Sequence, residues 1–206
     1  MTEALALTVA TVSLGVSLVT AWLALLRRGT VKMTQPTVIF FGPDSPGRER
    51  RASAKIYLRT LLFSTSKRGH VIESMHVRLS GNEAHQNFNI WVYGERARLV
   101  RGSGLFVGEA GVAADHHFLP PPDRSGFVFS EGRYRLEVFA HLLGDHRSIQ
   151  LFTQDLTVSR ETAEALAEPD TGVYFDWGPD AARYYPHVEK RAPSPDLEAL
   201  LRDADA

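Results

Sequence analysis

The first part of the chain is apolar without interruption. Ala4 to Leu26 contains no charged residue and no proline. As an α-helix that rises ~1.5 Å per residue, this stretch would span ~34 Å, which is enough to cross the hydrocarbon core of a bilayer. The pattern predicts a single transmembrane helix, with residues 1–28 as the anchor.

The flanks of this segment favour a retained anchor over a secretory signal peptide. Glu3 precedes the apolar run where a signal peptide would have basic residues, and Leu26 leads directly into Arg27 and Arg28 without a small-residue cleavage site. Together with Lys32, these two arginines lie C-terminal to the helix, and such charges prefer the cytoplasmic side. We therefore expect the rest of the chain to face the cytoplasm. The reverse topology, with a role in the envelope or in adhesion, stays open.

Small residues recur along the predicted helix at alternating steps of four and three. They are Ala6, Ala10, Ser13, Ser17, Thr20 and Ala24. Small residues allow the backbones of transmembrane helices to approach closely, so this stripe is a candidate packing face for a second copy or a partner helix. Such residues are also common in any transmembrane helix, and the pattern alone does not separate the two interpretations.

Beyond a juxtamembrane linker, residues 29–36, the pattern changes to short segments in which apolar and polar residues alternate. The β segments predicted on this basis are 37–41, 54–65, 71–79, 87–93, 103–108, 112–119, 134–143 and 148–158. The last two form a predicted hairpin. About eight such segments without long helices predict a mainly β, antiparallel sandwich over residues 37–188. Within it, residues 160–168 are a predicted short helix with Ser159 as N-cap.

One segment resembles a known class of sandwich. Gly132, Tyr134, Leu136 and Val138 fall at alternate positions, which is similar to the entry of strand F in immunoglobulin-like and fibronectin type III-like domains. The resemblance implies that Tyr134 forms a tyrosine corner and that Trp91 is a core aromatic on strand C. It also implies a scaffold or contact module more than an enzyme.

The C-terminal part of the predicted domain is rich in aromatic residues. Trp177, Tyr184 and Tyr185 have few aliphatic neighbours. The segment could add an edge strand and lid to the sandwich, or it could present these side chains to a protein partner as anchors. The remaining residues, 189–206, are a predicted flexible tail.

Charge is distributed unevenly along the chain. Residues 27–68 hold ten Lys or Arg against two acids, although the whole chain has a net charge of −1, which predicts no attraction to nucleic acid. The cations nearest the membrane or in the first predicted turn are Arg27, Arg28, Lys32, Arg48, Arg50 and Arg51. They are candidates for contact with anionic lipid headgroups, and the alternative is ordinary stop-transfer charge plus a solvated loop.

Few residues suggest chemistry. The chain has no cysteine, and Asp115, His116 and His117 are the only local cluster of metal-ligand residue types. Neighbours in a strand point to opposite faces, so this cluster does not predict a metal site, and no nucleophile elbow or phosphate loop is present. We expect no cofactor and no small-molecule substrate. The leading hypothesis is a non-enzymatic, single-pass membrane protein that binds a protein partner or forms a homo-oligomer. The alternative is a tethered enzyme or ligand-binding domain near these three residues.

Overall fold

The structure is a computed structural model that describes residues 2–22, 29–44, 53–81, 84–95, 98–121 and 126–190. It contains an N-terminal helix, α1 (Thr2–Ala21), and a β-rich unit. The elements of that unit are β1 (Val31–Met33), β2 (Val38–Pro43), β3 (Ala54–Ser64), β4 (His70–Gly81), β5 (Ala84–Phe88), β6 (Ile90–Glu95), β7 (Arg98–Arg101), β8 (Leu105–Val107), β9 (Val112–Leu119), β10 (Gly132–Leu142), β11 (Ile149–Val158), α2 (Arg160–Leu166), β12 (Thr171–Gly178) and β13 (Arg183–Lys190).

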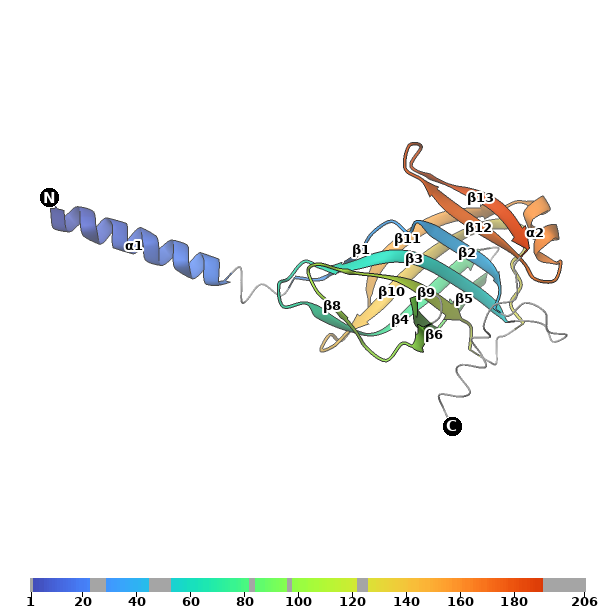
Figure 1. Cartoon of the computed structure of the whole chain (residues 1–206), viewed down its shortest axis with the longest axis horizontal. Coiled ribbons are helices and arrows are strands. Elements are labelled where there is room, and N and C mark those ends of the chain that lie inside the picture. The colour runs from blue at the N-terminus through green and yellow to red at the C-terminus, as the bar shows by residue number, and fades with distance from the viewer. Residues whose placement is uncertain are drawn as a thin grey trace.

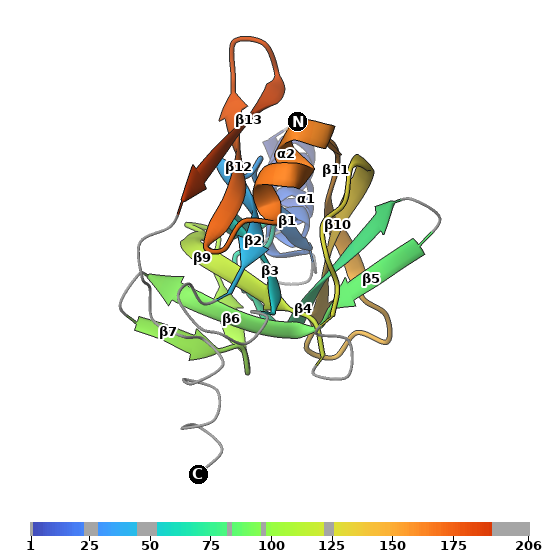
Figure 2. The ribbon, with the colours of Figure 1, turned by 90° about the vertical axis from the view of Figure 1, so that its right-hand side faces the viewer.

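The strands form two antiparallel sheets that face each other (Figures 1 and 2). The larger sheet has the order β13-β12-β2-β3-β9-β6-β7, with β1 also paired to β3. The smaller sheet has the order β11-β10-β4-β5, with β8 also paired to β4. The predicted mainly β, antiparallel sandwich with one apolar N-terminal helix is therefore confirmed.

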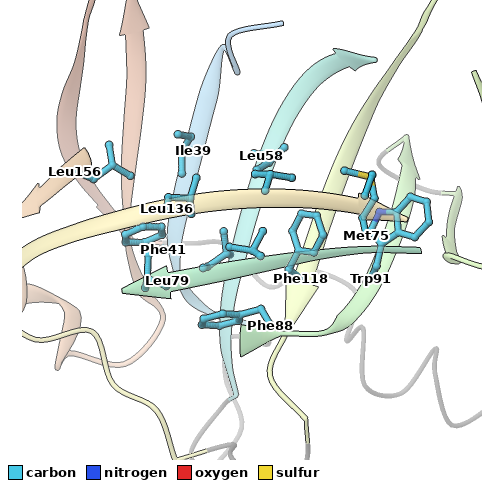
Figure 3. Close-up of a cluster of buried hydrophobic side chains, with 14 of the residues drawn as sticks. Ile39, Phe41, Leu58, Met75, Leu79, Phe88, Trp91, Phe118, Leu136 and Leu156 are labelled. Carbon is cyan, nitrogen blue, oxygen red and sulfur yellow. The ribbon is translucent and has the colours of Figure 1, made fainter. Parts of the chain in front are cut away.

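The core lies between the sheets, as the alternation of apolar residues requires. On β3, Ile56, Leu58 and Leu62 point inward and are completely buried. They meet residues of the smaller sheet such as Leu79 and Leu136 (Figure 3). Both sheets contribute inward-facing rows to this interior, and Ala163 and Leu166 of α2 pack against it.

The segment predicted as a linker contains a strand. Val31, Lys32 and Met33 pair with the end of β3, and β2 pairs with its beginning, so β1 and β2 share one edge of β3. Between them the backbone N–H of Thr34 donates to the carbonyl of Leu61, and that of Thr37 donates to the carbonyl of Arg59. The chain thus enters the sandwich almost as soon as the described residues resume at Gly29.

Two of the predicted segments differ from the observed strands. Residues 87–93 were expected to form one strand, but β5 and β6 belong to different sheets and Asn89 lies between them. Trp91 is buried, as the resemblance implied, but it lies on β6 of the larger sheet. The strand that pairs with β10, where the resemblance implies strand C, is β4. On β4 the register shifts between Ser74 and Ile72, because Glu73 is an extra residue. Ile72 consequently takes the core position that simple alternation gave to Val71.

The hairpin of β10 and β11 is confirmed, with an irregularity in its register. Val138 is opposite Phe152 and Phe139 is opposite Gln150, so Leu151 is the extra residue of a bulge. The predicted short helix is also present as α2, and the side chain of Ser159 accepts a hydrogen bond of 3.1 Å from the backbone N–H of Thr162. The aromatic segment forms the hairpin of β12 and β13, and β12 pairs with β2. This confirms the extra edge strand.

Candidate functional site

The three residues of the only sequence cluster of ligand types lie side by side on β9 but face opposite ways. His116 is opposite Leu58 and Tyr93 and points into the core, whereas Asp115 and His117 are on the outer face of the larger sheet. Within the described residues no group of three or more His, Cys, Asp or Glu side chains could hold a metal ion. The strand geometry thus separates the histidines, as the alternation of side chains predicts.

His116 is a core residue. Its side chain is 0% exposed and its Nδ1 accepts a hydrogen bond of 3.2 Å from the indole N–H of Trp91. An accepting Nδ1 places the proton of the neutral imidazole on Nε2, and the buried Nε2 has no hydrogen-bond partner among the described residues. Burial lowers the pKa of His116 to about 4, against a smaller raising effect of the Asp115 charge. The ring is therefore neutral at physiological pH.

The Asp115 carboxylate accepts hydrogen bonds from two side chains of β3. Its Oδ1 accepts hydrogen bonds from Arg59 Nη1 at 2.6 Å and from the Tyr57 hydroxyl at 3.2 Å. The Tyr57 ring in turn packs against His117, with a centroid distance of 4.9 Å. Burial, and then the charge of Asp115, raises the pKa of the Tyr57 hydroxyl well above its usual range. This arrangement holds the Asp115 carboxylate in an ion pair with Arg59 and in a hydrogen bond with Tyr57 on the outer face of the larger sheet.

The aromatic hairpin presents only one of its three candidate anchors to solvent. Trp177 and Tyr184 are half-buried and pack edge to face, with ring centroids 5.1 Å apart. The Tyr184 hydroxyl donates a 2.8 Å hydrogen bond to the carbonyl of Pro36, and burial raises the pKa of Tyr184. Tyr185 lies on the outer face of the hairpin, 39% exposed, with the Arg183 guanidinium 4.5 Å from its ring centroid. Tyr184 thus fastens the hairpin, and Tyr185 is available for contact.

The candidate packing face of α1 is exposed along its described length. Ala6, Ala10, Ser13, Ser17 and Thr20 are all on a helix that has no buried residue, and Ala24 lies outside the described residues. The hydroxyls of Ser17 and Thr20 each donate a 2.8 Å hydrogen bond to the carbonyl four residues earlier. These polar groups are therefore satisfied within the helix itself.

Of the candidate lipid-contact cations, the structure describes only Lys32, which is exposed on β1. Arg27, Arg28, Arg48, Arg50 and Arg51 lie outside the described residues. Residues 48–51 fall between β2 and β3 in the sequence, and these two strands are paired at Pro43 and Ala54, at the beginning of β3. β1, which carries Lys32, is paired with the other end of β3, where Val31 is opposite Ser64. Over eleven residues β3 covers ~35 Å, so these two ends are far apart.

One buried ion pair could not be predicted from the sequence. Lys55 Nζ lies 3.0 Å from Asp44 Oδ1 and 3.2 Å from the Asp44 carbonyl oxygen, and both residues are almost fully buried. Lys55 occupies an outward position between Ala54 and Ile56, where a lysine normally reaches solvent. Nothing in the alternation of the strand distinguishes it from an exposed lysine, so only the fold reveals the pair.

Comparison with known proteins adds little. No protein-family model matches the chain, and no curated protein sequence matches it. Among solved structures, it is similar to the CooA pilin subunit from enterotoxigenic Escherichia coli, with 11% sequence identity and a TM-score of 0.31. That match covers 63% of this chain and 97% of the pilin chain.

Proposed function

We propose that the protein is a single-pass membrane protein whose α1 anchors an immunoglobulin-like domain that binds a protein partner. The observation that carries this proposal is the exposure of α1. It is an apolar helix of 20 residues with none of them buried against the sandwich. Such a surface is unfavourable in water, at ~25 cal/mol per Å² of exposed apolar area, so it needs lipid or partner helices around it.

The internal hydrogen bonds of α1 support a lipid environment. Thr8, Thr11, Ser17 and Thr20 each satisfy their hydroxyl on a carbonyl of the preceding turn. A hydrocarbon surrounding offers no water to such groups, so self-satisfaction is what a membrane helix requires. The cations that follow α1 favour a cytoplasmic position for the sandwich.

The immunoglobulin-like assignment is supported by Tyr134 and by strand order. The Tyr134 hydroxyl donates a 2.8 Å hydrogen bond to the carbonyl of Ser130 and accepts one of 2.9 Å from its N–H, which is the arrangement of a tyrosine corner. If β10 is taken as strand F, the order β11-β10-β4-β5 corresponds to G-F-C-C′ and β2-β3-β9-β6 to A-B-E-D. The β12–β13 hairpin is then an addition to the edge of strand A.

For partner binding we propose the β13 edge. Seven of its eight residues are exposed, including Val188 and Tyr185, and β13 ends the order of the larger sheet. An edge strand presents main-chain donors and acceptors that a strand of another protein can pair with, while apolar side chains beside it add specificity. The alternative of an enzyme near Asp115, His116 and His117 is not proposed, because those side chains face opposite sides of β9.

The anchor is tested on the full chain by washing membranes at alkaline pH, with reporter fusions at both termini to establish topology. Retention with a cytoplasmic C-terminus is the expected result, and release of an intact chain into the wash would contradict the anchor. A reporter active only outside the cytoplasm would reverse the orientation.

The β13 edge is tested by affinity purification in mild detergent. Val188→Glu should remove the partner that wild type retains, whereas Val100→Glu should not. Val100 is a matched control because it is also an exposed valine, on β7 at the opposite edge of the same sheet. Equal retention by both variants would contradict binding at β13.

A further inference from the structure

The end of the sandwich nearest α1 has a surface that the proposed function does not use. Residue Thr30 is tied to the β3–β4 turn, since the backbone N–H of Thr65 donates to the Thr30 carbonyl at 2.9 Å and the Thr65 side-chain oxygen accepts from the Thr30 N–H at 2.8 Å. Trp22, at the end of α1, and Gly29 are seven residues apart. Even fully extended, seven residues span only ~25 Å. This turn therefore stays close to whatever surrounds the end of α1.

Two large apolar side chains are exposed at this end, on the two chain segments that flank Val71 of β4. Phe106 on β8 is opposite Val71 of β4, and the N–H of Leu143 donates to the carbonyl of the same Val71 at 2.9 Å. Phe106 is 61% exposed and Leu143 is 64% exposed. The Phe106 ring lies over Gly69 of the β3–β4 turn, where a Cβ would come within 2.5 Å of it. Phe106 and Leu143 thus flank one backbone position, Val71, near the start of β4.

Cations surround this apolar pair. Lys67 and Arg68 are exposed in the β3–β4 turn beside Gly69, and Arg147 is exposed in the β10–β11 turn that follows Leu143. With Lys32 on β1, four cations lie at this end with three exposed acids, Glu73 on β4 and Glu109 and Asp145 in turns. Apolar side chains set among Lys and Arg are the composition of a surface that enters the headgroup region of an anionic bilayer.

We propose that this surface, formed by Phe106, Leu143, Lys67, Arg68 and Arg147, binds the anionic membrane into which α1 inserts. Phe106 and Leu143 enter the boundary between headgroups and acyl chains, and the three cations contact lipid phosphates. The inference rests on the proposed anchor, because tethering by α1 makes the docking intramolecular and raises the effective concentration of this end at the bilayer. Docking would set the orientation of the sandwich, with β13 and its edge held to one side.

The absence of cysteine makes the test direct, because a single introduced cysteine gives a unique label. The full chain carries a nitroxide at His146→Cys, which is exposed between Leu143 and Arg147, and is reconstituted into vesicles of phosphatidylcholine with phosphatidylglycerol. The matched control label is at Val128→Cys. The side chain of Val128 is 66% exposed, close to the 64% of Leu143, but Val128 precedes β10 and Leu143 follows it, so the two lie at opposite ends of that strand.

The expected result is that oxygen reaches the label at 146 while a water-soluble nickel complex does not, and that the label at 128 stays open to nickel. Phe106→Ser with Leu143→Ser should return the label at 146 to water. Lys67→Gln, Arg68→Gln and Arg147→Gln together, or vesicles of phosphatidylcholine alone, should weaken its shielding. Unchanged mobility at 128 would show that each variant is folded.

Two results would overturn the inference while leaving the anchor intact. One is a label at 146 that is as open to nickel as the label at 128, in protein that alkaline washing does not release. The other is shielding that rises with the ratio of protein to lipid, which would mean that a second copy covers the surface. Release of the protein by the alkaline wash would instead remove the anchor and the inference together.

Discussion

The indole N–H of Trp91 donates a 3.2 Å hydrogen bond to Nδ1 of His116 inside the core of the sandwich. Trp91 reaches His116 from the neighbouring strand, since β6 pairs with β9, and the two rings are nearly parallel at 16°. The bond exists only while the imidazole is neutral, because a protonated Nδ1 can no longer accept. This relationship gives the fold a dependence on pH.

Acid should destabilise the protein through His116. Its pKa is about 4 in the fold and ~6.5 in an unfolded chain, so the unfolded state binds more protons between these values. The free energy of unfolding should therefore fall as the pH decreases from ~7 to 4, by ~3 kcal/mol from this group. Denaturation of the full chain in micelles, followed by tryptophan fluorescence, measures it. His116→Gln should flatten the slope and His146→Gln should not; an unchanged slope in His116→Gln would refute the assignment.

Removing the Tyr134 hydroxyl should weaken the entry into β10. Tyr134→Phe keeps the ring in the core but deprives the Ser130 N–H and carbonyl of their partner, which should cost ~1–3 kcal/mol. Tyr185→Phe is the matched control, because that ring is on the outer face, and its cost should be within ~0.5 kcal/mol. Comparable midpoints of chemical denaturation in the two variants would argue against a stabilising corner.

Replacing the buried Lys55 should strongly reduce the stability of the fold. Lys55→Met removes the ammonium group beside the buried Asp44 carboxylate, and breaking such a pair from one side costs ~3–5 kcal/mol. Lys190→Met, at the exposed end of β13, should change stability by less than ~0.5 kcal/mol. Thermal unfolding of both variants distinguishes them, and equal midpoints would contradict a stabilising role for the Lys55–Asp44 pair.

Charges in the middle of α1 should release the protein from membranes. Each arginine at the centre of a membrane helix costs ~2.5–3.5 kcal/mol on the insertion scale, so Val12→Arg with Val16→Arg should greatly reduce the fraction that resists alkaline washing. Two arginines at the start of the helix, Thr2→Arg and Glu3→Arg, can reach the interface and should reduce it less. Full retention of the central variant would be incompatible with a single spanning helix.

Much of the fold could be predicted because long alternating segments have one buried face. β3 and the β10–β11 hairpin lie close to the residue ranges predicted for them, and Ser159 is the N-cap of α2, as predicted. The predictions failed where a single residue reverses the alternation of faces along a strand or marks the point at which the chain crosses to the other sheet. Glu73 adds one residue to β4 and so exchanges the faces of Val71 and Ile72, and Asn89 carries the chain from one sheet to the other. Neither residue type marks such an event by itself.

The candidate sites were less predictable because they depend on which strands become neighbours. Strand alternation correctly separated His116 from His117, but nothing near Trp177 and Tyr184 in the sequence shows that Tyr184 bonds to Pro36 and so fastens the hairpin. Phe106 and Leu143 were overlooked for the same reason. Each is an ordinary apolar residue beside a turn, and only the pairing of both with Val71 brings them together.

The position of β2 has a consequence for biosynthesis. β2 lies between β3 and β12, so the neighbour at residues 54–64 is synthesised soon after β2 and the neighbour at residues 171–178 much later. Until residues 171–178 leave the ribosome, the edge of β2 that pairs with β12 has no partner strand, and Ile39 and Phe41 of β2 are not yet covered by β12. Nascent chains stalled before residue 171 would therefore expose an unpaired edge and be a target for chaperones.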